Sequence, residues 1–207
     1  MMEDQRLRHL ILIRHAAPGI DRTRPASGWP LSDDGRAACS PLADEIAPYR
    51  PTVIVSSHEA KAVETATLVA TRLGIVPTTA NGLHEHERRN VPWLDGALWT
   101  ETVAEFFAHP DNLIFGQETA RQARDRFTSA VLSVLELYPT YTVVIVAHGT
   151  VMSLFVAAQA GEAFDLWQRL GMPSFVVLTL PELAVERIVA KMPVVETVSG
   201  SEEGEPG

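Results

Sequence analysis

Short apolar runs that recur between amphipathic stretches constrain the fold of this chain most. Residues 10–13 are apolar throughout, and residues 142–147 are apolar after the first position, which is typical of strands buried on both faces of a sheet. Stretches with helical spacing separate these runs. Strands that alternate with helices favour a mainly parallel sheet with helices on both faces. We therefore expect an α/β fold, a three-layer sandwich with a mainly parallel central sheet.

The pattern predicts six strands, four helices and one insertion without clear periodicity. Strands are expected over residues 7–13, 52–55, 75–79, 142–147, 175–180 and 185–190, the last two forming a hairpin. Helices are expected over residues 32–47, 60–73, 118–138 and 151–160, and Gly74 is a typical C-cap. Aromatic residues with scattered charge mark residues 81–116, which we expect to form a small cap insertion over the sheet.

Size and charge limit the classes of function. The 207 residues suffice for one domain, expected over residues 1–193 with its cap. Residues 194–207 are rich in Gly, Ser and Glu, and we expect them to be a disordered acidic tail. The net charge of −9 argues against nucleic acid as a partner. It also means that local cations must hold any anionic substrate.

Cysteine content and the terminal segments favour a cytoplasmic protein. Cys39, the single cysteine, allows no internal disulfide, and we expect it to pack in a helix rather than act as a nucleophile. No segment approaches the ~18 apolar residues of a membrane span, and the first residues lack a signal-peptide pattern. We expect no membrane partner. The sequence leaves the oligomeric state open, a homo-oligomer included.

Two of the expected strands end in a histidine. Arg14 and His15 follow the first strand, and His148 and Gly149 follow the strand at 142–147. Ligands of open α/β sheets bind beyond the carboxyl ends of the strands. A lone histidine after a strand is more often a structural polar group. Two of them at equivalent strand ends favour function, because adjacent parallel strands would bring both imidazoles into one crevice.

Five short motifs follow one another along the chain: Arg14-His15-Ala16, Ser56-Ser57 with Lys61-Ala62-Val63-Glu64-Thr65-Ala66, Leu83-His84-Glu85, Gly116-Gln117-Glu118-Thr119 and Ala147-His148-Gly149. In these motifs and their order the sequence resembles the histidine phosphatase superfamily, which includes the cofactor-dependent phosphoglycerate mutases. The resemblance covers about residues 7–190 and implies a phosphomonoesterase that uses no metal and no cofactor. It implies that His15 is the nucleophile and becomes transiently phosphorylated.

The resemblance also implies roles for the other matched residues. Arg14 would clamp phosphoryl oxygens and lower the pKa of His15, whose second ring nitrogen would donate to a backbone carbonyl. His148 would donate to the same oxygens in the transition state, and Ser57 and Lys61 would bind the phosphate. Glu85 would protonate the leaving alkoxide and then deprotonate water. The structural alternatives are an N-cap for Ser57 and a solvated charge for Glu85.

Four features depart from the family's pattern. Lys61 stands where the family has arginine, so the planar two-point contact is lost, and Arg22 or Arg24 is a candidate replacement. Ala16 stands where the family has glycine and would be strained at positive φ. The continuation after Ala16 lacks the family's common Glu-Ser/Thr, and the cap is short for a mutase.

Three functions therefore remain open. We prefer hydrolysis of a small phosphorylated metabolite. The alternatives are a mutase-like phosphotransferase and a non-catalytic binder of phosphorylated ligands. The aromatic residues of the cap favour a partly apolar leaving group, and Arg88 and Arg89 are candidates for contacting a second anionic group. At strand spacing, His84 and His86 would share a face, but two histidines do not make a zinc site, so we expect no metal.

Overall fold

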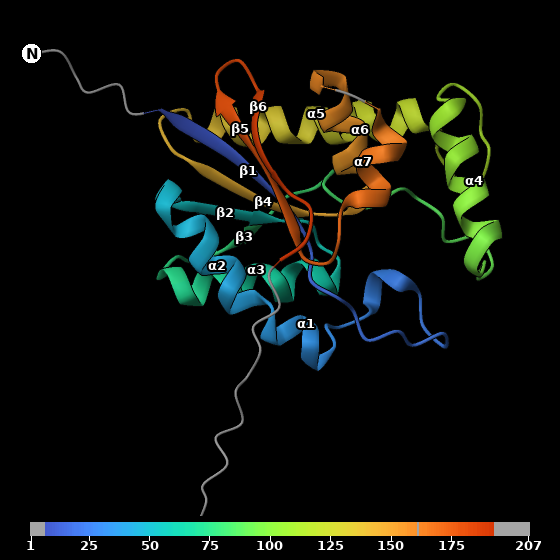
Figure 1. Cartoon of the computed structure of the whole chain (residues 1–207), viewed down its shortest axis with the longest axis horizontal. Helices are drawn as coiled ribbons and strands as arrows, with labels where there is room; N and C mark the ends of the chain where they lie inside the picture. The colour runs from blue at the N-terminus through green and yellow to red at the C-terminus, as the bar shows by residue number, and fades with distance from the viewer. Residues whose placement is uncertain (1–6, 161, 193–207) are drawn as a thin grey trace, which may run out of the picture.

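The computed structural model describes residues 7–160 and 162–192, and a six-stranded sheet lies at its centre (Figure 1). The strand order is β3-β2-β4-β1-β5-β6. The first four strands along the chain pair in parallel, whereas β5 and β6 form an antiparallel hairpin at one edge. This confirms the mainly parallel sheet. The strands are β1 (Arg8–Arg14), β2 (Val53–Ser56), β3 (Thr78–Thr79), β4 (Val143–Ala147), β5 (Ser174–Leu180) and β6 (Ala184–Val189).

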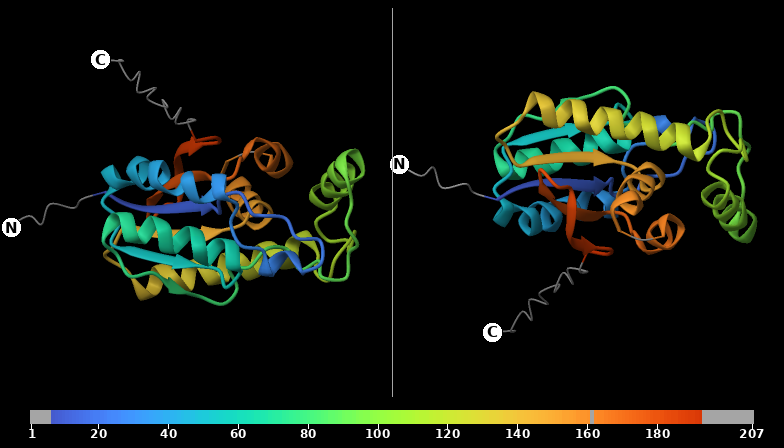
Figure 2. Two further views of the ribbon diagram at one scale, coloured as in Figure 1. Left: turned by 90° about the horizontal axis from the view of Figure 1, so that it is seen from below. Right: turned by 90° about the horizontal axis from the view of Figure 1, so that it is seen from above.

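Helices cover both faces of the sheet, which confirms the three-layer α/β fold (Figure 2). One face carries α1 (Asp33–Ala37), α2 (Cys39–Ile46) and α3 (Ala60–Leu73). The other carries α5 (Ala120–Leu137), α6 (Gly149–Ala160) and α7 (Ala163–Arg169). No helix in the described ranges is both long and apolar enough to cross a membrane.

The packing of β1 on both of its faces explains why its sequence is continuously apolar. Leu10 and Leu12 lie in the core with residues of α5 and α6, whereas Ile11 and Ile13 lie in the core with residues of α2 and α3. All four side chains are fully buried. Burial of each contributes about 1.5–3 kcal/mol. A central strand packed on both faces needs an apolar residue at every position, and this requirement fixes β1 in the middle of the sheet.

Several element boundaries differ from the sequence expectation. The helix expected over 32–47 divides at Ala38 into α1 and α2. Pro41 has no N–H to donate to the preceding turn, which disfavours one continuous helix. The strand expected over 75–79 is only β3, because Pro77 cannot donate to the sheet. The short helix α7 was not expected. Cys39 is buried at the start of α2, as expected, and burial raises the pKa of its thiol to about 12.

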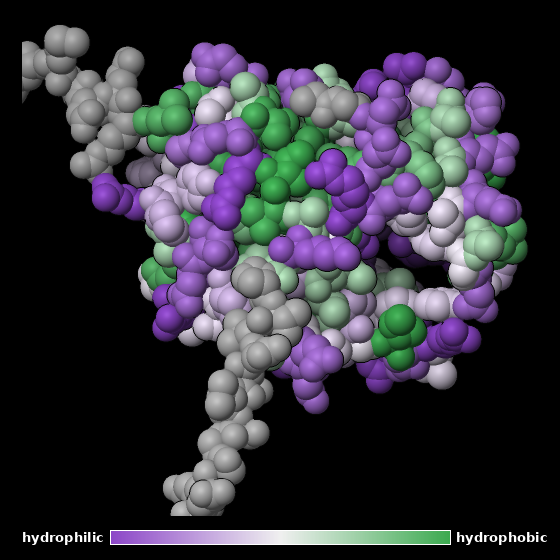
Figure 3. All heavy atoms as spheres, viewed as in Figure 1, coloured by the Kyte–Doolittle hydropathy of each residue, from purple (hydrophilic) through white to green (hydrophobic). Residues whose placement is uncertain are grey.

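The segment expected to be a cap extends beyond the carboxyl ends of the parallel strands and contains α4 (Gly96–Ala108) (Figure 2). Phe106 of α4 is fully buried, with its ring 4.4 Å from that of His86 and 5.3 Å from that of Phe115. α4 also contacts α7. A hollow separates the cap from the sheet layers on the face shown in Figure 3. The tail expected over residues 194–207 lies outside the described residues.

Candidate active site

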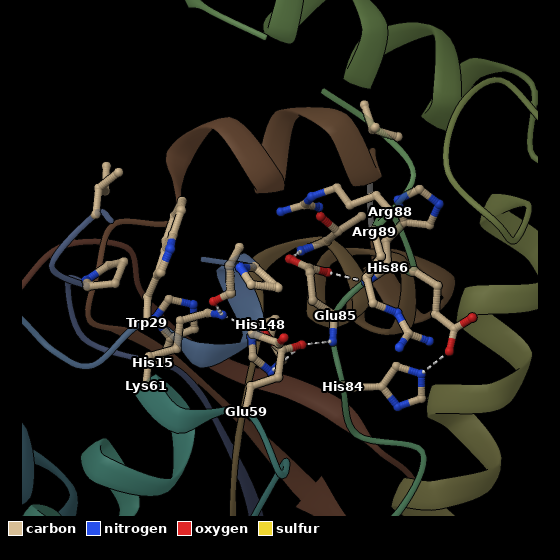
Figure 4. Close-up of a pocket in the computed structure, with 18 of the residues that line it drawn as sticks. His15, Trp29, Glu59, Lys61, His84, Glu85, His86, Arg88, Arg89 and His148 are labelled. Carbon is tan, nitrogen blue, oxygen red and sulfur yellow. Dashed lines mark hydrogen bonds and ion pairs between the residues drawn. The ribbon is translucent and has the colours of Figure 1, made fainter. Parts of the chain in front are cut away.

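The carboxyl ends of β1 and β4 bring two histidines together. The two strands are neighbours, and Arg14 pairs with Ala147, so His15 and His148 follow at the same edge of the sheet. Their ring centroids are 5.1 Å apart at an interplanar angle of 62°. Both rings are buried at the floor of a cavity of about 1030 Å³ (Figure 4). The two imidazoles thus lie in one crevice, as expected.

His15 is held as a neutral imidazole with one free nitrogen. Its Nδ1 lies 2.8 Å from the carbonyl oxygen of Ala16, and donation across this contact assigns the free lone pair to Nε2. Burial lowers the pKa of His15 well below its usual value, and His148, Lys61 and Arg14 add to the effect. The contribution expected from Arg14 is present, but burial is the larger cause. A neutral ring nitrogen is a nucleophile at neutral pH.

Two cations reach the floor of the cavity. Arg14 donates from Nη1 to the carbonyl oxygen of Leu170, and its buried Nε has no partner among the described residues. Lys61 is 6% exposed, and its ammonium donates to the carbonyl oxygen of Ala26 at 2.8 Å. The charge of Lys61 therefore lies inside the site. Arg14 keeps a donor available for an anion.

Ser57 joins His148 to the start of α3. Its hydroxyl lies 2.7 Å from Nε2 of His148 and accepts the backbone N–H of Glu59 at 3.1 Å. The N-cap position of α3 belongs to Glu59, so the N-cap interpretation of Ser57 is wrong. Burial is the main cause that lowers the pKa of His148 to about 4, even though the carboxylates of Glu59 and Glu85 oppose it.

Glu85 faces the histidines from the loop before the cap helix. One carboxylate oxygen accepts the backbone N–H of His86 at 2.8 Å, and the other accepts that of Thr150, in the first turn of α6, at 3.2 Å. Burial alone would raise the pKa of Glu85. Arg88, His148 and the two N–H donors outweigh burial and hold the pKa well below its usual range. The structural alternative, in which Glu85 is only a solvated charge, is therefore wrong.

Arg126 of α5 fixes the loop that carries Glu85. Its guanidinium donates to the carbonyl oxygens of Gly82, His84 and Glu85 at 2.8, 2.9 and 3.2 Å, and it also pairs with Glu118. Our sequence reasoning missed Arg126. The available signal was its position within the apolar stripe of a helix, where a cation needs a partner.

Glu59 is a second functional residue that the motifs did not indicate. Its carboxylate is 13% exposed and lies between Lys61, His148 and the backbone of Glu85 (Figure 4). Burial alone would raise the pKa of Glu59, but His148 and Lys61 outweigh it and lower the pKa to about 2. The signal in the sequence was an acidic residue two positions before Lys61, at the entry to a helix.

Other predicted residues lie farther out or differ from expectation. Arg22 and Arg24 line the outer part of the cavity, where they are exposed and paired with Asp95 at 3.6 Å and Asp21 at 3.2 Å. Lys61, in contrast, is buried inside the site. Ala16 is not among the described residues with positive φ, so alanine is unstrained there.

The two histidines of the Leu83-His84-Glu85-His86 segment contact different groups. The segment is a loop and not a strand. His84 contacts Glu87 at 3.3 Å, whereas His86 is bonded to the carbonyl oxygen of Glu118 at 2.9 Å. Their rings therefore have separate partners.

Aromatic rings and guanidinium groups form the walls of the cavity. Arg22 lies over the ring of Trp93 at 4.4 Å and Arg88 over that of Trp99 at 4.9 Å, while Arg89 also lines the cavity. A pocket of this size and polarity accommodates a ligand far larger than a phosphate ion. Every tryptophan of the chain contributes to the walls: Trp29, Trp93, Trp99 and Trp167.

Solved structures share this fold. A structure described as mycobacterial hydrolase 2 has a TM-score of 0.75 and 20% identity, covering 92% of this chain and 94% of that one. A mycobacterial glucosyl-3-phosphoglycerate phosphatase has a TM-score of 0.67 and 20% identity, with coverage of 91% and 100%. The phosphoserine phosphatase of Entamoeba histolytica, in complex with 3-phosphoglyceric acid, has a TM-score of 0.70 and 16% identity, with coverage of 88% and 97%.

Sequence comparison identifies the family. Among curated proteins, no sequence match was found. The model of the histidine phosphatase superfamily (branch 1) matches residues 10–185, which include most of the sheet, the cap and both histidine-bearing strand ends. The chain therefore belongs to the histidine phosphatase superfamily (branch 1).

Proposed function

We propose that this enzyme hydrolyses phosphate monoesters through a phosphohistidine intermediate at His15. The observation that carries the proposal is the neutral imidazole of His15, with Nε2 free, in a crevice that also holds His148, Arg14 and Lys61. A nucleophile surrounded by donors to oxygen suits transfer of a phosphoryl group, whose transition state spreads negative charge over three oxygens.

In the first step, Nε2 of His15 attacks phosphorus. The N–P bond forms as the ester P–O bond breaks. Arg14, Lys61 and His148 bind the phosphoryl oxygens, and Glu85 delivers a proton to the leaving oxygen. Glu85 is ionised in the free site. A bound phosphoryl dianion adds negative charge beside it, which raises its pKa and allows it to take up that proton.

In the second step, water replaces the departed alcohol. The carboxylate of Glu85 accepts a proton from water as the water oxygen attacks phosphorus. The N–P bond breaks, inorganic phosphate leaves, and His15 returns to its neutral form. The same carboxyl group thus acts as acid in one step and as base in the other.

The walls of the cavity support a leaving group that is larger than glycerate and partly apolar. The cavity has a volume of about 1030 Å³ and is lined by four tryptophans. A small doubly charged ester would leave much of this wall in contact with water. We therefore propose, as the substrate, a phosphorylated metabolite with a ring or an apolar portion, which the tryptophans would contact.

The test is release of inorganic phosphate from an aryl phosphate in the presence of excess chelator. We expect turnover by the wild-type enzyme and none by His15→Ala. An isomerised product without free phosphate would favour a phosphotransferase. Binding of the ester without turnover would favour a non-catalytic binder. A series of esters of increasing size tests the substrate class, and a preference for small, doubly charged esters would contradict it.

A further inference from the structure

The carboxylate of Glu59 lies at the centre of the phosphoryl-binding groups. Oε1 accepts the backbone N–H of Glu85 at 2.9 Å and lies 3.5 Å from Nε2 of His148. Oε2 lies 2.5 Å from the ammonium of Lys61. One side chain thus contacts three groups that the proposed reaction uses: a cation, an imidazole and the backbone of the acid–base residue (Figure 4).

The contacts of Glu59 determine where Lys61 points. The ammonium has two acceptors, the carbonyl oxygen of Ala26 and the carboxylate of Glu59. The lysine side chain is only 7% exposed, so these acceptors hold it against the floor of the cavity. A flexible lysine, which lacks the fixed fork of arginine, needs such anchoring to place its charge.

Glu59 also places a negative charge where a phosphoryl group would bind. Several elements contribute charged or titratable groups around it. Lys61 comes from α3, His148 from the end of β4, and Arg14 and His15 from the end of β1. The loop before the cap helix contributes His84, Glu85 and Arg88.

These groups leave little positive charge for a dianion. His15 and His148 are neutral because burial lowers the pKa of each ring, and His84 also has a lowered pKa. Arg14, Lys61 and Arg88 then face the carboxylates of Glu59 and Glu85, and these five groups together carry one net positive charge. A phosphoryl dianion brings two negative charges into a poorly hydrated site, where an uncompensated charge is costly.

We propose that Glu59 is a positioning residue that anchors Lys61 and makes the binding of a dianionic oxyanion depend on the uptake of a proton from solvent. The proton goes to Glu59 itself, to Glu85 or to His148, and the site then matches the charge of the anion. This proposal rests on the proposed function, because it assumes that the phosphoryl group binds among these residues.

The test measures binding of tungstate, which, unlike phosphate, keeps two negative charges at and above neutral pH. Calorimetric titration at about pH 7.5 in two buffers of different protonation enthalpy counts the protons taken up on binding. We expect the wild-type enzyme to take up roughly one proton. Glu59→Gln keeps the size of the side chain and removes its charge. It should take up clearly fewer protons and bind tungstate at least about tenfold more tightly.

Two further variants separate charge from structure. Glu136→Gln removes an exposed carboxylate of α5, and it should bind tungstate as the wild-type enzyme does. Glu59→Asp keeps the charge and should keep the proton uptake. Thermal unfolding verifies that each variant is folded, and if Glu59→Gln is not, Glu59→Asp and the wild-type proton count still decide. A wild-type enzyme that takes up no proton overturns the proposal.

The remaining outcomes are also decisive. Equal proton uptake and equal affinity in Glu59→Gln and wild type overturn the role of Glu59. Absence of tungstate binding to the wild-type enzyme overturns both this proposal and the proposed function. If tungstate binding and its proton uptake are as expected but no phosphate ester is hydrolysed, only the proposed function fails.

Discussion

At the scale of single residues, a variant of Lys61 tests whether its anchored ammonium binds the phosphoryl oxygens together with Arg14. Lys61→Gln removes one charge-assisted hydrogen bond of about 1.5–3 kcal/mol, so we expect kcat/KM to fall roughly 10- to 150-fold. Steady-state kinetics with an aryl phosphate measure this loss. Arg24→Gln is the informative comparison, since Arg24 lies at the exposed rim beside Asp21. A larger loss for Arg24→Gln than for Lys61→Gln would reverse the assignment.

Glu85 gives a second prediction at this scale, which concerns the leaving group. Glu85→Gln cannot donate a proton, so hydrolysis of alkyl phosphates should fall by about 10²–10⁴. An ester with a good leaving group, such as nitrophenyl phosphate, needs less protonation, and its first step should be much less affected. Pre-steady-state measurement of alcohol release from both esters tests this difference. Equal losses for the two esters would mean that Glu85 acts by position or charge instead.

At the scale of elements, the junction of β4 and α6 depends on Gly149. A Cβ atom at this position would lie 2.9 Å from both Cζ and Nε of Arg14. Gly149→Ala should displace the guanidinium and lower kcat/KM by about tenfold or more, with little change in thermal stability. Gly28→Ala is the matched control, because a Cβ there has no atom within 4 Å. A fully active Gly149→Ala enzyme would show that Arg14 does not need this space.

The elements also show how far the sequence predicts the fold. Continuous apolar runs identified β1 and β4, because a strand buried on both faces must be apolar throughout. The helix over 60–73 was predicted with its observed bounds, since Gly74 ends it in a left-handed conformation. The division between α1 and α2 and the shortness of β3 depend on single prolines and on tertiary contacts. Periodicity does not report either of these.

The candidate site was predictable where a strand end fixes a residue and less so where loops converge. His15 and His148 follow adjacent strands, so topology alone brings them together. Glu59 and Arg126 act through contacts between segments that are distant in sequence, and no local pattern encodes such contacts. A lysine at position 61 lacks the planar fork of arginine, and for that reason the sequence points to Arg22 or Arg24 as substitutes. In the folded protein, burial and two acceptors fix the position of the Lys61 ammonium, which local sequence patterns do not indicate.

At the scale of the whole molecule, the buried histidines link stability to pH. The pKa of His148 is about 4 in the folded chain, below the ordinary value of 6.5 that we assign to the unfolded chain. The unfolded state therefore binds more protons between these values, and stability rises with pH across this window. His148 alone should add about 2 kcal/mol to the free energy of unfolding between pH 5 and pH 7.

Urea unfolding at about pH 5 and pH 7 measures this gain. His15, His84 and His86 also have lowered pKa values, so the total gain in the wild-type protein should exceed the share of His148. His148→Asn removes that share and should show a correspondingly smaller gain. The assignment of a buried, neutral His148 fails if the variant and the wild-type protein gain the same stability over this range.

The most direct test of the central claim is to trap the phosphorylated enzyme. Rapid mixing with an aryl phosphate, followed by an alkaline quench, preserves phosphohistidine, which is labile in acid and stable in base. Mass spectrometry of the digested protein then locates the phosphate. We predict phosphate on His15 in the wild-type enzyme, formed at a rate compatible with turnover and absent from His15→Ala. Phosphate on another residue, or turnover by His15→Ala, would contradict the account.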